Sequence, residues 1–268
     1  MRRALLLVVP LLCACPPTLE PVDAGPQLNP SYKHAHNDYE HARPLLDALE
    51  QHFESVEADI WLDGNGSDLG VSHGGAPFKG TLRALYLEPL KERVAANGGS
   101  VHGDGKPFFL WIDLKDGSRS LQDVLATQLA SYDFLTQFDD AGPTRQGAVT
   151  VLLTGDASAK KALAARAAPR SWARDSNDYT ADDPPADGQW VTYAVNYFSF
   201  FTWDGTGAMP AKQRAQLENL VAGAHAKGRT LRIYASPDTE AFWLAARDAH
   251  VDFINTDQLA DLARALSP

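Results

Sequence analysis

Cysteine is scarce in this sequence of 268 residues, which contains only Cys13 and Cys15. Both lie within the first fifteen residues, so no cysteine is left for the rest of the chain. The folded part is therefore expected to have no disulfide and no thiol chemistry.

Positive charge is also in short supply, with 24 Lys and Arg against 34 Asp and Glu and a formal net charge of −10. Removal of a leader that contains Arg2 and Arg3 would change this charge from −10 to −12. An acidic surface repels polyanions, which argues against nucleic acid as a partner. A negatively charged substrate would need a locally positive site, supplied by a metal ion or a few basic residues.

The apolar run Ala4–Leu12 is too short to span a bilayer as a helix. It follows a basic start, Met-Arg-Arg, and ends in the sequence LCAC, which resembles a bacterial lipoprotein signal. Cys15 fits as the acylated residue better than Cys13, because the residue before Cys13 is a bulky leucine. The alternative is a plain secretory leader with two incidental cysteines.

Three segments are predicted from this pattern. Residues 1–15 form a lipoprotein-type signal segment, residues 16–30 with their five prolines form an extended tether, and residues 31–268 form a single domain. No second linker and no clear internal repeat follows the tether. We expect secretion across the inner membrane and a lipid anchor that holds the protein in the cell envelope or on a periplasm-facing surface.

Strand-like and helix-like segments alternate along the domain. The strand candidates are Tyr32–His36, Ser55–Leu62, Phe108–Lys115, Ala148–Thr154, Arg170–Asp175, Trp190–Tyr197, Thr230–Ala235 and Val251–Asn255. The helix candidates are Pro44–His52, Tyr86–Ala96, Leu121–Phe134, Ser158–Ala167, Pro210–Lys227, Thr239–Ala249 and Gln258–Leu266.

This alternation predicts an α/β fold of parallel strands joined by crossover helices. Eight strands are the number that closes a (β/α)8 TIM barrel, which needs about 250 residues. The competitor is a doubly wound open sheet, but no glycine-rich phosphate loop follows the first strand. The sequence DDPP at 182–185 makes residues 170–188 the least regular part of the pattern.

Two acidic residues, Glu57 and Asp59, share one face of the strand Ser55–Leu62, because successive side chains of a strand alternate. On a half-exposed strand these acids would simply be solvated. Inside a closed barrel they would repel each other and lose hydration unless a cation lay between them. Carboxylate oxygens at this spacing suit Mg²⁺ or Ca²⁺.

Further polar residues lie where strands are predicted to end, which is where barrel active sites form. Asp113 and Lys115 end one strand, although a local Asp–Lys pair would also explain them. His34 lies near the end of the first strand and His73 shortly after the second. The other histidines, His36 apart, are read as structural or exposed.

The short motifs that contain these residues, in this order along the chain, resemble those of the superfamily of glycerophosphodiester phosphodiesterases and phosphatidylinositol-specific phospholipase C. The sequences HAHNDY, RPLLDAL, SVEADIWL, WIDLKDG and VDFINTD are most similar to the branch named for altered inheritance of mitochondria protein 6. The resemblance extends from Tyr32 to Leu266 and implies a PLC-like barrel and phosphoric diester hydrolysis.

The resemblance also implies roles for individual residues. Catalytic roles fall on His34, His73 and Lys115, metal ligation on Glu57, Asp59 and Asp113, and substrate or loop positioning on Asn37 and His36. Arg232 and Tyr234, near the end of a later strand, are added as candidate substrate-binding residues.

Two positions depart from the pattern of the glycerophosphodiesterases. Those enzymes have His-Arg-Gly at the first strand, whereas His34-Ala35-His36 lacks the arginine. They also have glutamate as the third acid, where Asp113 in the sequence Asp-Leu-Lys is more like the sphingomyelinase D type. These differences concern the substrate more than the chemistry.

The predicted enzyme is therefore a metal-dependent phosphoric diester hydrolase, in which one histidine accepts a proton and the other donates one. Its substrate would be a small phosphodiester or one derived from a phospholipid, with the membrane reached through the lipid anchor. One alternative is a non-catalytic surface lipoprotein that uses the barrel for binding. A glycosidase is another, but the i, i+2 spacing of Glu57 and Asp59 suits a shared cation better than an opposed acid and nucleophile.

Overall fold

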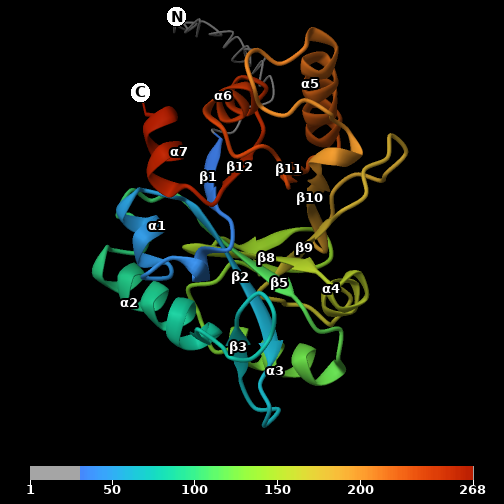
Figure 1. Ribbon diagram of the computed structural model, residues 1–268. Coiled ribbons are helices and arrows are strands. Elements are labelled where there is room, and N and C mark those ends of the chain that lie inside the picture. Colours follow the sequence, from blue (N-terminus) through green and yellow to red (C-terminus); the bar gives the residue numbers. More distant parts are fainter. Residues whose placement is uncertain (1–30, 268) are drawn as a thin grey trace, which may run out of the picture.

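The computed structural model describes residues 31–267 (Figure 1). The predicted signal segment, residues 1–15, and the predicted tether, residues 16–30, lie outside the described residues. In the part that is described, no helix is long and apolar enough to cross a membrane.

Eight parallel strands form the closed barrel that the alternating pattern predicts. In ring order they are β1 (Tyr32–Ala35), β2 (Ser55–Leu62), β5 (Phe108–Leu114), β8 (Val149–Gly155), β9 (Ala173–Ser176), β10 (Trp190–Asn196), β11 (Thr230–Tyr234) and β12 (Phe253–Thr256). The ring closes because β1 pairs with both β12 and β2. The fold class predicted from the sequence is confirmed.

The helices lie outside the strands (Figure 1). They are α1 (Leu46–Glu50), α2 (Glu88–Ala96), α3 (Arg119–Leu129), α4 (Ala157–Ala164), α5 (Ala211–Ala226), α6 (Glu240–Asp248) and α7 (Leu259–Ala265). Each lies within a predicted segment or overlaps it. The prediction was wrong in extending α3 to Phe134, because the chain turns at 130–131 and again at 133–134 before Leu135 bridges to Val149.

Side-chain caps explain where several helices begin after a strand. Ser118 accepts a hydrogen bond from the backbone N–H of Leu121 at the start of α3. Asp156 accepts from Ser158 and Ala159 at the start of α4. Such caps satisfy N–H groups that have no partner in the first turn, so the residues that follow β5 and β8 turn directly into a helix.

The connections between barrel strands contain short elements, most of which the sequence pattern did not predict. β3 (Leu69–Val71) and β4 (Gly80–Thr81) extend the sheet beyond β2 in antiparallel fashion. β6 (Gln137–Phe138) and β7 (Pro143–Arg145) form a separate hairpin. Two short 3₁₀-helices are η1 (Asp38–Glu40) and η3 (Tyr197–Ser199). The π-helix η2 (Arg83–Leu87) leads into α2 and overlaps the start of the predicted helix Tyr86–Ala96.

The predicted strand Arg170–Asp175 was placed too early, because the observed strand begins at Ala173. Arg170 instead bridges to Phe138. Within residues 31–267, the β9-to-β10 connection is the one between consecutive barrel strands that has no helix. It contains the DDPP sequence, whose prolines cannot continue a helix.

The barrel interior is apolar at one end and charged at the other. Trp111, Leu152 and Phe253 belong to a compact buried cluster within the strands. Residues further along the same face of β2 and β5 are acidic, since Asp113 lies two positions after Trp111. This places the polar groups at the carboxyl ends of the strands, where barrel active sites lie.

A partly buried ion pair at the opposite end of the barrel makes stability depend on pH. His225, in the last turn of α5, lies 2.7 Å through Nε2 from Oδ2 of buried Asp252, which also accepts from the backbone N–H of Leu231. The hydrogen bond with Asp252 raises the pKa of His225 above its ordinary value of 6.5.

We expect the contribution of His225 to stability to be fully present below pH 6.5 and to be lost as the pH rises through the raised pKa of the folded state. Because His225 is partly exposed, urea denaturation between pH 5.5 and 8.5 should show wild type losing at most about 1 kcal/mol of unfolding free energy that His225→Gln does not lose. Parallel pH profiles for the two proteins would contradict this assignment.

Candidate metal centre and active site

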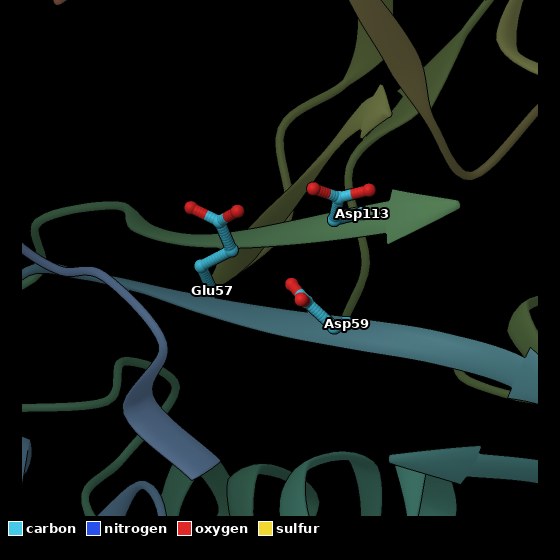
Figure 2. Close-up of side chains that lie close together, drawn as sticks. All are labelled: Glu57, Asp59 and Asp113. Atoms are coloured by element: carbon cyan, nitrogen blue, oxygen red, sulfur yellow. The ribbon is translucent and has the colours of Figure 1, made fainter. Parts of the chain in front are cut away.

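Three carboxylates converge at the carboxyl ends of β2 and β5. Glu57 and Asp59 lie on one face of β2, and strand register places Asp113 of β5 directly opposite Asp59. One oxygen from each carboxylate lies within 4.8 Å of the others. Figure 2 shows the three carboxylates close together over β2 and β5. The sequence therefore predicted this cluster correctly as a juxtaposition.

Lys115 lies between two of these acids. Its Nζ is 2.9 Å from Oδ2 of Asp59 and 2.9 Å from Oδ2 of Asp113. Burial, together with the charges of Glu57 and Asp59, raises the pKa of Asp113 to about 6, and Lys115 opposes that rise. Burial and then Glu57 also raise the pKa of Asp59. One lysine thus compensates only part of the negative charge that the barrel confines here.

The cluster has unused ligand capacity. Oδ1 of Asp59 and Oδ1 of Asp113 are buried and find no hydrogen-bond partner among residues 31–267. A buried carboxylate oxygen without a partner costs free energy, because its hydration is not replaced. Hard divalent cations prefer carboxylate oxygens at such sites. The residues present therefore fit a Mg²⁺ or Ca²⁺ ion.

Glu57 is held by two nitrogen groups. Its Oε2 accepts from Nε2 of His34 at 3.2 Å and pairs with the Arg232 guanidinium. Burial alone would raise the pKa of Glu57, but Arg232 and the hydrogen bond from His34 hold that pKa below its usual range. Glu57 therefore remains ionised inside the barrel.

His34 lies beneath Glu57 and does not line the cavity. Its side chain is fully buried, and Nδ1 lies 2.7 Å from the Ser55 hydroxyl. Burial and then the Arg232 charge lower the pKa of His34 to about 3. Because this neutral ring has no open path to a substrate, its placement argues against the catalytic role predicted for it. The geometry assigns His34 to the support of Glu57.

His36 occupies the cavity wall instead. Parallel register pairs His34 with Ser55, so His36 lies level with Glu57, two positions nearer the open end. Its Nδ1 is 2.9 Å from Oδ1 of Asp257, at the end of β12. Burial opposes the charged ring, but the bond to Asp257 and the charge of Glu57 outweigh it and raise the pKa of His36.

His73 approaches the acids from the loop after β3, as expected. Its Nδ1 is 3.2 Å from Oδ2 of Asp59, and its side chain is 72% exposed, so the rest of the ring is open to solvent. The Tyr39 hydroxyl donates to the same Asp59 oxygen at 2.7 Å. Asp59 therefore orients a histidine that a substrate can reach.

These groups surround a cavity of about 370 Å³. It is lined by His36, Glu57, His73, Asp113, Lys115, Thr154, Gly155, Asn177, Arg232 and Tyr234. The predicted substrate-binding residues Arg232 and Tyr234 are among them. Asn37 is not; its Oδ1 lies 2.7 Å from the Tyr39 hydroxyl oxygen, and its left-handed backbone (φ 47°) turns the chain. It positions the loop that follows His36.

Sequence reasoning missed Asp257, Thr154, Gly155 and Asn177. Each immediately follows a barrel strand or lies at its end. The rule that barrel active sites form at the carboxyl ends of strands could have selected them. They carry no distinctive spacing, so only the closed ring brings them together.

Comparison with known proteins identifies the family of the chain. A family model described as the AIM6-like phosphodiesterase domain matches residues 23–172. The chain belongs to this family. The match contains Glu57, Asp59, Asp113 and both cavity histidines, whereas Arg232 and Asp257 lie beyond it.

Curated relatives of this AIM6-like domain share its sequence over most of the chain. Altered inheritance of mitochondria protein 6 from Eremothecium gossypii is 28% identical over 260 residues, which cover 84% of this chain and 67% of that protein. The protein of the same name from Kluyveromyces lactis is 28% identical over 296 residues, covering 86% and 71% respectively.

Two solved structures share the fold at low sequence identity. A glycerophosphodiester phosphodiesterase from Agrobacterium tumefaciens has a TM-score of 0.56 at 15% identity and covers 89% of this chain and all of its own. A Ca²⁺-dependent phosphatidylinositol-specific phospholipase C from Streptomyces antibioticus has a TM-score of 0.58 at 14% identity, with coverage of 90% and 97%. These two likenesses show the fold, whereas the predicted branch of altered inheritance of mitochondria protein 6 is confirmed by the family match and the curated relatives.

Gly155 packs against the Asp113 carboxylate and leaves no room there for a side chain. Its φ is +84°, and a Cβ added there would overlap Oδ1 of Asp113 and lie 2.6 Å from the backbone N of Leu114. We expect Gly155→Ala to displace the Asp113 carboxylate, to weaken divalent-cation binding about tenfold and to cost about 1–3 kcal/mol of stability.

Isothermal titration with Mg²⁺ and with Ca²⁺, together with urea denaturation, would measure both effects. Gly64→Ala is the matched control, because nothing lies within 4 Å of a Cβ at Gly64. Unchanged cation affinity in Gly155→Ala would show that the position of Asp113 does not matter for the ion.

Proposed function

We propose that this AIM6-like domain is a metal-dependent phosphoric diester hydrolase with two histidines that transfer protons. The observation that carries the proposal is the convergence of three acids, one lysine and two histidines on one cavity at the carboxyl end of the barrel. Phosphoryl transfer depends on alignment and on stabilisation of charge, and this set supplies both.

Glu57, Asp59 and Asp113 would hold the cation, either Mg²⁺ or Ca²⁺. When bound, the cation would stabilise negative charge on the phosphoryl group. The partnerless oxygens of Asp59 and Asp113 support this assignment, and one of the two structural neighbours is described as Ca²⁺-dependent. Lys115 would add positive charge beside the same phosphate.

His36 would take the proton-transfer role that the sequence suggested for His34. Asp257 engages Nδ1, which leaves Nε2 of His36 to face the substrate, and the raised pKa favours a protonated ring. His36 would therefore donate a proton to the leaving oxygen. Nδ1 of His73 lies against Asp59, so its Nε2 would accept a proton from water or a neighbouring substrate hydroxyl.

The substrate would be a small phosphodiester or one derived from a phospholipid. The cavity wall is mostly polar or charged, with Tyr234 as its one large aromatic side chain. A cavity of about 370 Å³ accommodates a phosphate with a compact head group. We also propose that the protein is secreted across the inner membrane and held by a lipid anchor in the cell envelope, which would bring the site to lipid-derived substrates.

A glycosidase is disfavoured by the same geometry. Glycosidase carboxylates flank a sugar, with separations of about 5–5.5 Å or 6.5–9.5 Å. Here all three acids share one space, and Lys115 bridges two of them.

The proposal predicts turnover that needs both a cation and His36. Purified protein would be incubated with glycerophosphocholine, lysophospholipids, phosphatidylinositol and bis(p-nitrophenyl) phosphate, with Mg²⁺, Ca²⁺ or a chelator. Phosphorus NMR would follow the products and would distinguish a cyclic from a linear phosphate. We expect Glu57→Gln and His36→Asn each to lower kcat/KM by at least about 100-fold.

His52→Asn is the matched control, because His52 is exposed and asparagine tolerates its positive φ of 54°. His34→Asn should retain more activity than His36→Asn. Cation binding without turnover of any diester would favour a non-catalytic binding protein instead. Equal losses in His34→Asn and His36→Asn would leave the reassignment without support.

The His36–Asp257 pair predicts a pH effect. Asp257→Asn keeps a hydrogen-bonding side chain but removes the charge that helps to raise the pKa of His36. If His36 is the acid, the alkaline limb of the kcat/KM profile should move to lower pH in this variant. An alkaline limb that stays in place would exclude His36 as the acid.

A further inference from the structure

Arg232 is a buried arginine at the wall of the cavity. Its side chain is 3% exposed, and it pairs with Glu57 across the barrel, from β11 to β2. Nε donates to Oδ1 of Asn255 at 3.0 Å, and the guanidinium lies 4.8 Å from the centre of the Trp111 ring. Three contacts of different kinds therefore fix one permanent positive charge beside the proposed cation site.

The fixed charges at this site do not cancel. Glu57, Asp59 and Asp113 contribute three carboxylates, whereas Arg232 and Lys115 contribute two cations. Two neighbouring pairs compensate themselves, namely buried Lys160 with Asp175, whose Nζ lies 2.5 Å from Oδ1, and protonated His36 with Asp257. The acid cluster with its two cations is left with one net negative charge, and a bound divalent cation would change this to one net positive charge.

We propose that Arg232 sets this balance, so that the cation-loaded site carries the single positive charge that a phosphodiester monoanion neutralises. This inference rests on the proposed function, and it deepens that function by naming the residue that determines the charge of the site. Arg232 acts on the diester through the field of its charge, with at least two of its nitrogens already bonded to Glu57 and Asn255.

Removal of the charge has opposite consequences for the two ligands. Without Arg232 the cluster would hold two net negative charges, which attract a divalent cation more strongly. The cation-loaded site would then be neutral and would attract a diester less. Mere loss of support for Glu57 would instead weaken cation binding, so the sign of the change separates the two roles.

The test uses the full chain and two probes. Isothermal titration measures the affinity for Mg²⁺ and Ca²⁺, and phosphorus NMR measures the affinity of the cation-loaded protein for dimethyl phosphate, a monoanionic diester. For Arg232→Gln we expect the cation affinity to rise by up to about tenfold and the dimethyl phosphate affinity to fall about tenfold. Arg232→Lys, which keeps the charge, should stay within about threefold of wild type for both.

A second variant keeps the test decisive if Arg232→Gln does not fold. Asn255→Asp keeps the side-chain shape but places a carboxylate where the amide oxygen now accepts from Nε of Arg232. It should shift both affinities in the same directions as Arg232→Gln. Arg214→Gln removes a charge from the outer surface of α5, where Arg214 pairs with Glu218, and should match wild type.

The outcomes separate the two proposals. Cation binding that weakens while dimethyl phosphate affinity stays unchanged would overturn the role of Arg232 and leave the proposed function standing. A wild-type protein that binds neither Mg²⁺ nor Ca²⁺ would overturn both. Opposite shifts for cation and diester in Arg232→Gln or in Asn255→Asp would support the charge balance.

Discussion

Glu57, Asp59 and Asp113 place three carboxylates inside a closed sheet, where burial raises the free energy of each ionised group. The sheet cannot relax this repulsion, because Asp59 and Asp113 face each other in strand register and Glu57 follows from the same strand. Lys115, which directly follows β5, neutralises part of this negative charge. Arg232 neutralises another part from β11, on the far side of the barrel. The negative charge that remains is the physical basis for the proposed cation site.

The residues around the three carboxylates support them or leave room for them. His34 and Ser55 form a neutral support beneath Glu57, Tyr39 and His73 share one oxygen of Asp59, and Gly155 leaves room for the Asp113 carboxylate. The aromatic cluster around Trp111 fills the barrel below and excludes water from that side. The site is thus closed beneath and open above, so that a substrate can approach only from the carboxyl ends of the strands.

The sequence predicted the fold and most of the cluster, because alternation along β2 and β5 directly reports which side chains share a face. The sequence could not predict how far along the barrel axis each side chain lies. His34 and His36 share a face two positions apart, and only the register of β1 against β2 shows that His36 reaches the cavity while His34 lies below Glu57. Likewise, nothing in the spacing of Arg232 and Glu57, 175 residues apart, indicates that they pair. Short elements such as β3 and β4 escaped detection because two or three residues carry no measurable periodicity.

The central claim is that these three acids bind a divalent cation in the folded protein. Crystals grown with Mn²⁺, which takes the same oxygen ligands as Mg²⁺ and scatters anomalously, would test it most directly. The account predicts one strong anomalous peak within bonding distance of Glu57, Asp59 and Asp113 and its loss in Glu57→Gln. A well-occupied peak elsewhere, or none at this cluster at saturating Mn²⁺, would contradict it.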